Sequence, residues 1–182
     1  EVGVATIYKY FQTKVNLTIA ISAWIWTTFL GECEKEVPPE QRAQMNAYDL
    51  MSYYTDMIIK IYVEHPDMLR FSSNFKTFIN RNGATPEQLQ LHLGPLSPLR
   101  EDFHRQYEAA KKNGCIRTDV SEDDMYTTVS ITMLSMAERY AQGIVWADTQ
   151  KQDYKAELLY LKEMILNWMT MKLPTADSKG GG

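Results

Sequence analysis

The chain has 182 residues, of which 45% are hydrophobic and 23% are charged, and its formal net charge at pH 7 is −4. This composition is ordinary for a soluble globular protein that buries a substantial core. Residues 1–14 hold two lysines against one glutamate, so this stretch carries +1 and the remainder of the chain carries −5. An acidic body repels DNA, so any contact with nucleic acid is expected at the N-terminal end.

The sequence also disfavours a membrane span and a disulfide framework. The longest apolar run, 15–30, is interrupted by polar residues and falls short of the roughly 20 residues that a span requires. The two cysteines, Cys33 and Cys115, are far apart and belong to no CxxC motif. This predicts free thiols in a reducing compartment and a cytoplasmic location, with a disulfide or a redox sensor as the alternative.

The first stretch of the chain predicts a short helix, 3–10, followed by a break at Gln12 and a new helix that begins at Thr13. The short helix is dense in hydroxyl and ammonium groups, which commonly position a protein on the phosphate backbone of DNA. The predicted DNA-binding residues are Thr6, Tyr8, Lys9, Tyr10 and Lys14. The alternative is that this tyrosine-rich helix is simply part of the core.

The same residues carry a resemblance to a known family. The stretch Thr6-Ile7-Tyr8-Lys9-Tyr10-Phe11-Gln12-Thr13-Lys14, followed by Leu17, resembles the recognition-helix signature of TetR/AcrR-type transcriptional regulators. That signature is roughly Thr-Leu-Tyr-x-x-Phe-x-x-Lys-x-x-Leu. The resemblance implies that the matching Thr, Tyr and Lys contact phosphates or base edges and that the Phe and Leu pack the small domain. Glu1 and Gly3-Val4 depart from the Gly and Ser-Lys that are common before the signature.

A helix-turn-helix needs a supporting helix and a preceding partner helix, and both are expected to lie before residue 1. Residues 1–12 are therefore predicted to be the C-terminal part of a helix-turn-helix DNA-binding domain. Residues 13–174 are predicted to be a helical ligand-binding and dimerisation domain. Residues 175–182, which end in three glycines, are predicted to be a disordered tail.

The body is expected to be all-α, with no strand pattern and no internal repeat. Helices are predicted over 13–35, 39–64, 66–81, 97–112, 121–147 and 150–173, with a brief one after Thr85. The first of them has two apolar faces, which predicts a connector that contacts both the DNA-reading end and the body. These faces run through Leu17, Ile21, Trp24 and Thr28 and through Val15, Ile19, Trp26 and Leu30.

The middle helices are rich in aromatic residues and methionine, which suggests a cavity for a small ligand. Such pockets are mostly apolar with a few orienting polar groups, for which Asn74 is one candidate, and methionine suits a loosely fitting apolar ligand. The alternative for each residue is an ordinary place in the core. The predicted ligand-binding residues are Trp24, Tyr53, Met57, Phe71, Phe75, Phe78, Phe103, His104, Tyr107 and Met133.

The last two helices show heptad-like seams, with apolar residues at alternating steps of four and three. Such seams suit packing at a shallow angle, as in a four-helix bundle, and a twofold-related copy would complete the bundle. The alternative is that both seams face the chain's own core. The predicted homodimer interface is Val129, Met133, Met136, Tyr140, Leu158, Leu161, Ile165 and Trp168.

No enzyme motif is present in the sequence, which has no nucleophile elbow, HExxH, P-loop or Gly-rich dinucleotide turn. No cofactor or metal is predicted, because His65, His92 and His104 are in different helices and lack a partner at i+3 or i+4. The hypothesis is a homodimeric regulator, a repressor released from a palindromic DNA operator by a small, largely apolar molecule. The alternatives are a helical small-molecule carrier that binds no DNA, and a helical enzyme with an unrecognised site.

Overall fold

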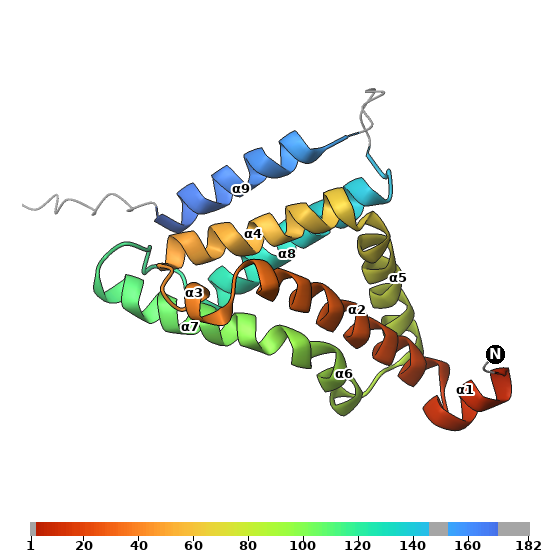
Figure 1. The fold of residues 1–182 in the computed structure, drawn as a ribbon. Helices are drawn as coiled ribbons and strands as arrows, with labels where there is room; N and C mark the ends of the chain where they lie inside the picture. Colours follow the sequence, from red (N-terminus) through yellow and green to blue (C-terminus); the bar gives the residue numbers. More distant parts are fainter. Residues whose placement is uncertain (1–2, 146–152, 171–182) are drawn as a thin grey trace, which may run out of the picture.

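The computed structural model describes residues 3–145 and 153–170, which form helices and connecting turns without a strand (Figure 1). The prediction of an all-α chain is confirmed for these residues. No described helix combines the length and the apolar character that a bilayer crossing requires. The elements are α1 Val4–Phe11, α2 Lys14–Glu36, α3 Pro39–Arg42, α4 Ala47–Glu64, α5 Pro66–Asn82, α6 Pro86–Leu93, the 3₁₀ helix η1 Gly94–Leu96, α7 Ser97–Lys112, α8 Glu122–Ala141 and α9 Lys155–Thr170.

Several helix ends are set by local side chains, as the sequence predicts. Thr13 begins α2 because its side chain accepts a hydrogen bond from the backbone N–H of Asn16 at 3.1 Å. Ser121 caps α8 in the same way. Gly83 ends α5 with φ of 67°, a left-handed conformation that glycine adopts without a steric penalty. These boundaries are confirmed.

Three predicted boundaries are wrong, and one of them is the start of the helix predicted over 150–173, since residues 153–154 are not helical and α9 begins at Lys155. The helix predicted over 39–64 is interrupted, because the Asn46 side chain accepts a hydrogen bond from the backbone N–H of Asp49 at 2.9 Å and starts α4 afresh. The helix predicted to reach residue 147 ends at Ala141, and Gly143, with φ of 71°, turns the chain. The predicted tail, 175–182, lies outside the described residues.

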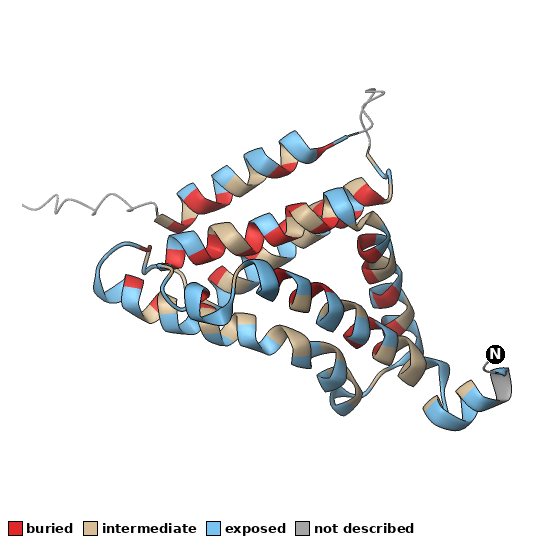
Figure 2. Ribbon diagram, viewed as in Figure 1, coloured by how far each residue is buried: buried red, intermediate tan, exposed pale blue. Residues whose placement is uncertain are grey.

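Helix α4 is the scaffold of the body, because it packs against α5, α7, α8 and α9. Its buried side chains join those of its neighbours in the main core, where Leu50, Phe103 and Met133 have no exposed surface. Figure 2 shows the buried residues concentrated along α4 and along the sides of the helices that face it. Most of the stabilising apolar burial therefore lies in this part of the molecule.

A second, smaller apolar cluster lies where α2 meets α5 and α6. Its buried members are Ile19, Phe75 and Ile79, against which Val15 and Phe78 are partly buried. Beyond this cluster α1 projects from the body at one end of the molecule (Figure 1). The N-terminal helix thus lies beyond the smaller of the two clusters and contacts α2.

The predicted dimer seams face the chain's own core, so their assignment to a dimer interface is corrected. Both α8 and α9 pack against α4, which covers the seams. Three other apolar side chains are exposed on α9, with exposed fractions of 44% for Leu159, 65% for Tyr160 and 67% for Met164. The seam residues that are buried are Val129, Met133, Leu158 and Ile165, and those that pack partly buried against the same core are Met136, Tyr140, Leu161 and Trp168.

Candidate functional site

Helix α1 carries four of the five predicted DNA-binding residues on its exposed sides. Ile7 and Phe11, one turn apart, are half-buried and form the attached side of the helix. Thr6 and Lys9 are exposed, and the rings of Tyr8 and Tyr10 are 59% and 83% exposed. The alternative that this helix belongs to the core is wrong for these four residues, which are Thr6, Tyr8, Lys9 and Tyr10.

The charges around α1 favour an anionic partner. Residues 2–31 contain no acidic residue, and Lys9 and Lys14 give this stretch a charge of +2. Lys14 is exposed at the start of α2, and its Nζ lies 5.6 Å from the centroid of the Phe78 ring, which is cation–π distance. This stretch is therefore less unfavourable to a phosphate group than the acidic remainder of the chain.

The joint between α1 and α2 is short and strained. Gln12 adopts φ of 61° and ψ of −44°, a conformation that costs a residue with a side chain about 1–3 kcal/mol. The Asn16 side chain holds the joint, because its Nδ2 donates a hydrogen bond to the carbonyl oxygen of Phe11 at 3.0 Å. The orientation of α1 on α2 therefore depends on a small number of contacts.

Helix α2 contacts both α1 and the body, as predicted for a connector, but its two apolar faces differ. On one face Ile19 and Leu30 are buried. On the other face Ile21 and Trp24 are 39% and 67% exposed, so this face is open among the described residues. The connector is therefore held to the body through one face.

An apolar cavity of about 510 Å³ lies between α2, α4, α7 and α8, with η1 at its edge. This volume is within the range of about 300–1,000 Å³ that is typical of small-ligand sites. Leu93, at the end of α6, also borders it. Its apolar lining includes Trp26, Phe29, Met57, Leu96, Tyr126 and Leu134.

Two polar groups of this cavity, on Tyr54 and Arg100, already have partners. The Tyr54 hydroxyl donates to the carbonyl oxygen of Leu99 at 3.0 Å, and burial raises the pKa of this phenol. Arg100 stacks on the Tyr126 ring, with its Cζ 4.5 Å from the ring centroid, and pairs with Glu122 at 3.4 Å and with Asp123. Because this guanidinium is balanced by two carboxylates, the cavity suits a neutral, largely apolar guest.

Of the predicted ligand-binding residues, Met57 lines this cavity. The other nine lie elsewhere. Phe71, Phe75 and Phe78 belong to the small cluster beside α6. Asn74 is exposed. The other predicted residues that are buried in the main core are Phe103, Tyr107 and Met133.

The remaining three predicted residues are at the surface or in other hollows. Trp24 borders a hollow at the start of α5, and Tyr53 borders another between α2 and α4. His104 is exposed, with its Nδ1 2.7 Å from Glu122 Oε2. A usable signal for the cavity was the apolar triplet at steps of three, Leu93, Leu96 and Leu99, which crosses the turn after α6.

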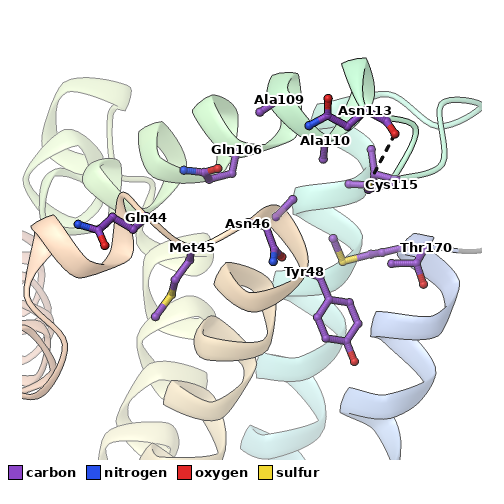
Figure 3. Close-up of a pocket in the computed structure, with 13 residues that line it drawn as sticks. Gln44, Met45, Asn46, Tyr48, Gln106, Ala109, Ala110, Asn113, Cys115 and Thr170 are labelled. Atoms are coloured by element: carbon purple, nitrogen blue, oxygen red, sulfur yellow. Dashed lines mark hydrogen bonds between the residues drawn. The ribbon is translucent and has the colours of Figure 1, made fainter.

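A further hollow of about 560 Å³ lies between the start of α4, the C-terminal part of α7 and the last turn of α9 (Figure 3). Two of its amides are engaged, because Asn46 caps α4 and Gln106 Nε2 donates to the carbonyl oxygen of Ala43 at 3.0 Å. Cys115, on its wall, is exposed, and its Sγ lies 3.7 Å from the Asn113 carbonyl oxygen. This hollow is at the opposite end of the molecule from α1 (Figure 1).

The two cysteines are free thiols, as predicted. Cys33 is buried, and burial raises the pKa of its thiol to about 11. Within the described ranges, no group of three or more His, Cys, Asp or Glu side chains is arranged to hold a metal ion.

His92 fastens α6 to α2. Its Nδ1 lies 2.9 Å from the Ser22 hydroxyl, and its ring centroid is 4.7 Å from that of Phe75. Burial and the nearby Lys76 ammonium lower the pKa of this imidazole. These contacts give His92 a structural role between the two helices.

No family model matches the chain, and no curated protein or solved structure is significantly similar to it.

Proposed function

We propose that the protein is a ligand-responsive transcriptional regulator of the TetR/AcrR type, a repressor in which α1 contacts DNA and the apolar cavity binds an effector. One observation carries this proposal: an exposed, acid-free helix with two tyrosines and a lysine projects from a body that has a half-open apolar cavity of about 510 Å³. Hydroxyl and ammonium groups on such a helix suit phosphate contacts. The cavity suits a small, largely apolar molecule.

A homodimer is part of the proposal, because a single short helix reads only a few base pairs. Two copies of α1 about 34 Å apart would enter successive major grooves of a palindromic site. The exposed apolar side chains of Leu159, Tyr160 and Met164 on α9 support an interface there. Tyr160 and Met164 are one turn apart, so they lie on one face of the helix, and exposed apolar patches commonly mark such surfaces.

The effector acts through α2, which borders the cavity at Trp26 and Phe29 and begins at the joint with α1. A guest between α2 and α8 tilts α2 and changes the distance between the two copies of α1. A coupling of about 1–3 kcal/mol is typical of such allostery, and it changes DNA affinity about 5- to 150-fold. The repressor is thereby released from its operator.

The test is a selection of random duplex DNA with the full-length protein, followed by a challenge of the selected complex with small apolar compounds. We expect a palindrome with half-sites one helical turn apart, and release of the DNA by at least one compound that enters the cavity. Recovery of no palindrome would contradict the regulator. Binding of the compounds without any selected DNA would favour the alternative, a helical carrier.

A further inference from the structure

Three side-chain hydrogen bonds connect the start of α6 to the end of α1. The backbone N–H of Thr85 donates to Gln88 Oε1 at 2.8 Å, which closes the capping box of α6. Gln88 Nε2 donates to Asn16 Oδ1 at 2.6 Å. Asn16 Nδ2 donates to the carbonyl oxygen of Phe11 at 3.0 Å. Two amide side chains thus bridge three helices.

The orientation of both amides in this chain is fixed by backbone groups at its two ends. A backbone N–H can only donate, so Gln88 presents its oxygen to Thr85 and its NH₂ group to Asn16. A carbonyl oxygen can only accept, so Asn16 presents its NH₂ group to Phe11 and its oxygen to Gln88. Turning either amide over would break two contacts of the chain at once.

Helix α6 spans the distance between this joint and the apolar cavity. Its first turn holds Gln88, whereas its last residue, Leu93, and the following Leu96 line the cavity. No residue of α6 is fully buried, and the helix is held by the partly buried Leu89 in the small cluster together with the polar contacts of Gln88 and His92. A hollow of about 380 Å³, bordered by Phe11 and Gln88, leaves α1 space to move relative to α6.

We infer that the Gln88–Asn16 contact is the relay by which occupation of the cavity releases α1. The inference rests on the proposed function for its effector. A guest that pushes against Leu93 and Leu96 displaces α6 along its length, which parts Gln88 from Asn16. Asn16 then loses the partner that orients its amide toward Phe11, and the strained joint at Gln12 is free to rearrange. Gln88 and Asn16 act as positioning residues.

The relay can be broken without disturbing the cap of α6. In Gln88→Glu, a carboxylate oxygen still accepts from the Thr85 N–H, since glutamate is a usual residue of the capping box. The carboxylate has no proton to donate to Asn16 Oδ1, so the chain to Phe11 is interrupted. Gln90→Glu is the matched control, because it places the same charge at an exposed position of the same helix.

The experiment measures amide hydrogen exchange of residues 4–12 in the full-length protein, with and without Nile red as a neutral apolar probe, whose fluorescence reports binding. In the wild type, saturating Nile red should speed this exchange about two- to tenfold, which is the effect of losing one net hydrogen bond. Gln88→Glu should exchange faster by a similar factor without the probe, bind Nile red with a dissociation constant within twofold of wild type, and show no further change. Gln90→Glu should behave as wild type.

The outcomes separate the relay from the proposed function. If Nile red binds and Gln88→Glu matches the wild type in basal exchange and in its response, the relay alone is overturned. If neither Nile red nor any other apolar compound binds the wild type, the effector site fails, and the coupling fails with it. If Gln90→Glu shifts exchange as much as Gln88→Glu does, the effect comes from added charge and the relay is likewise overturned.

Discussion

Helices α1 and α4 are attached to the rest of the molecule in opposite ways. Helix α4 buries side chains along its length and packs against four other helices. Helix α1 has half-buried Ile7 and Phe11, and none of its side chains over 6–11 is fully buried. Among the described residues, most of the apolar burial that stabilises the fold therefore surrounds α4, and α1 contributes little of it.

The largest expected effect is on the free energy of unfolding. It appears when one residue of the main core is compared with one residue of α1. Phe103→Ala removes a ring with no exposed surface from the main core, which should cost about 3–5 kcal/mol in unfolding free energy. Tyr10→Ala, at 83% exposure on α1, should change it by no more than about 0.5 kcal/mol. Urea titrations of both variants measure this. Similar losses for the two would mean that α1 is part of the cooperative core.

The second prediction concerns the cavity in the body. It measures ligand binding there, separately from the unfolding free energy. Leu134→Trp places a larger side chain into the cavity from α8 and should weaken Nile red binding at least about tenfold, because the indole occupies part of the space that the probe needs. Val63→Trp, which is exposed on α4 outside the cavity, is the control. Fluorescence titration measures both. Unchanged binding in Leu134→Trp would place the probe elsewhere.

The third and smallest effect concerns pH at the α2–α6 contact. The folded pKa of His92 lies below its ordinary value of 6.5, so the unfolded chain binds this proton more readily. Stability from this group is therefore fully present above that value and is lost as pH falls below it. In His92→Gln, the decrease in unfolding free energy between pH 7 and pH 5 should be smaller than in the wild type. An equal decrease would show that His92 does not contribute to it.

The parts of the fold that the sequence predicts well are those decided within a few residues. Thr13, Ser121 and Gly83 set helix ends through their own side-chain or backbone conformation, so they are recognisable without knowledge of the fold. The interruption at Asn46 is also local, but apolar spacing that continues from Ala43 to Ala47 conceals it. The continuous apolar spacing therefore led to one predicted helix over 39–64, although Asn46 is a capping residue.

The sequence predicts the exposed residues of α1 better than it predicts the lining of the cavity, and the reason is physical. The exposure of Tyr8 and Tyr10 follows from a two-turn helix whose apolar residues, Ile7 and Phe11, lie on one side. The cavity depends instead on which neighbour each helix face meets. An aromatic residue such as Phe75 fits a cavity wall and a core equally well in sequence, and the packing of α5 against α2 places it in the small cluster.

The central claim is that α1 and the adjoining Lys14 bind DNA, and the salt dependence of binding tests it most directly. The measurement is the slope of log affinity against log salt for the selected duplex, with wild type, Lys14→Ala and the control Lys35→Ala at the exposed far end of α2. Loss of a phosphate contact should flatten the slope by about 1 for each Lys14 in the complex. The claim predicts a shallower slope for Lys14→Ala alone, and an unchanged slope would contradict it.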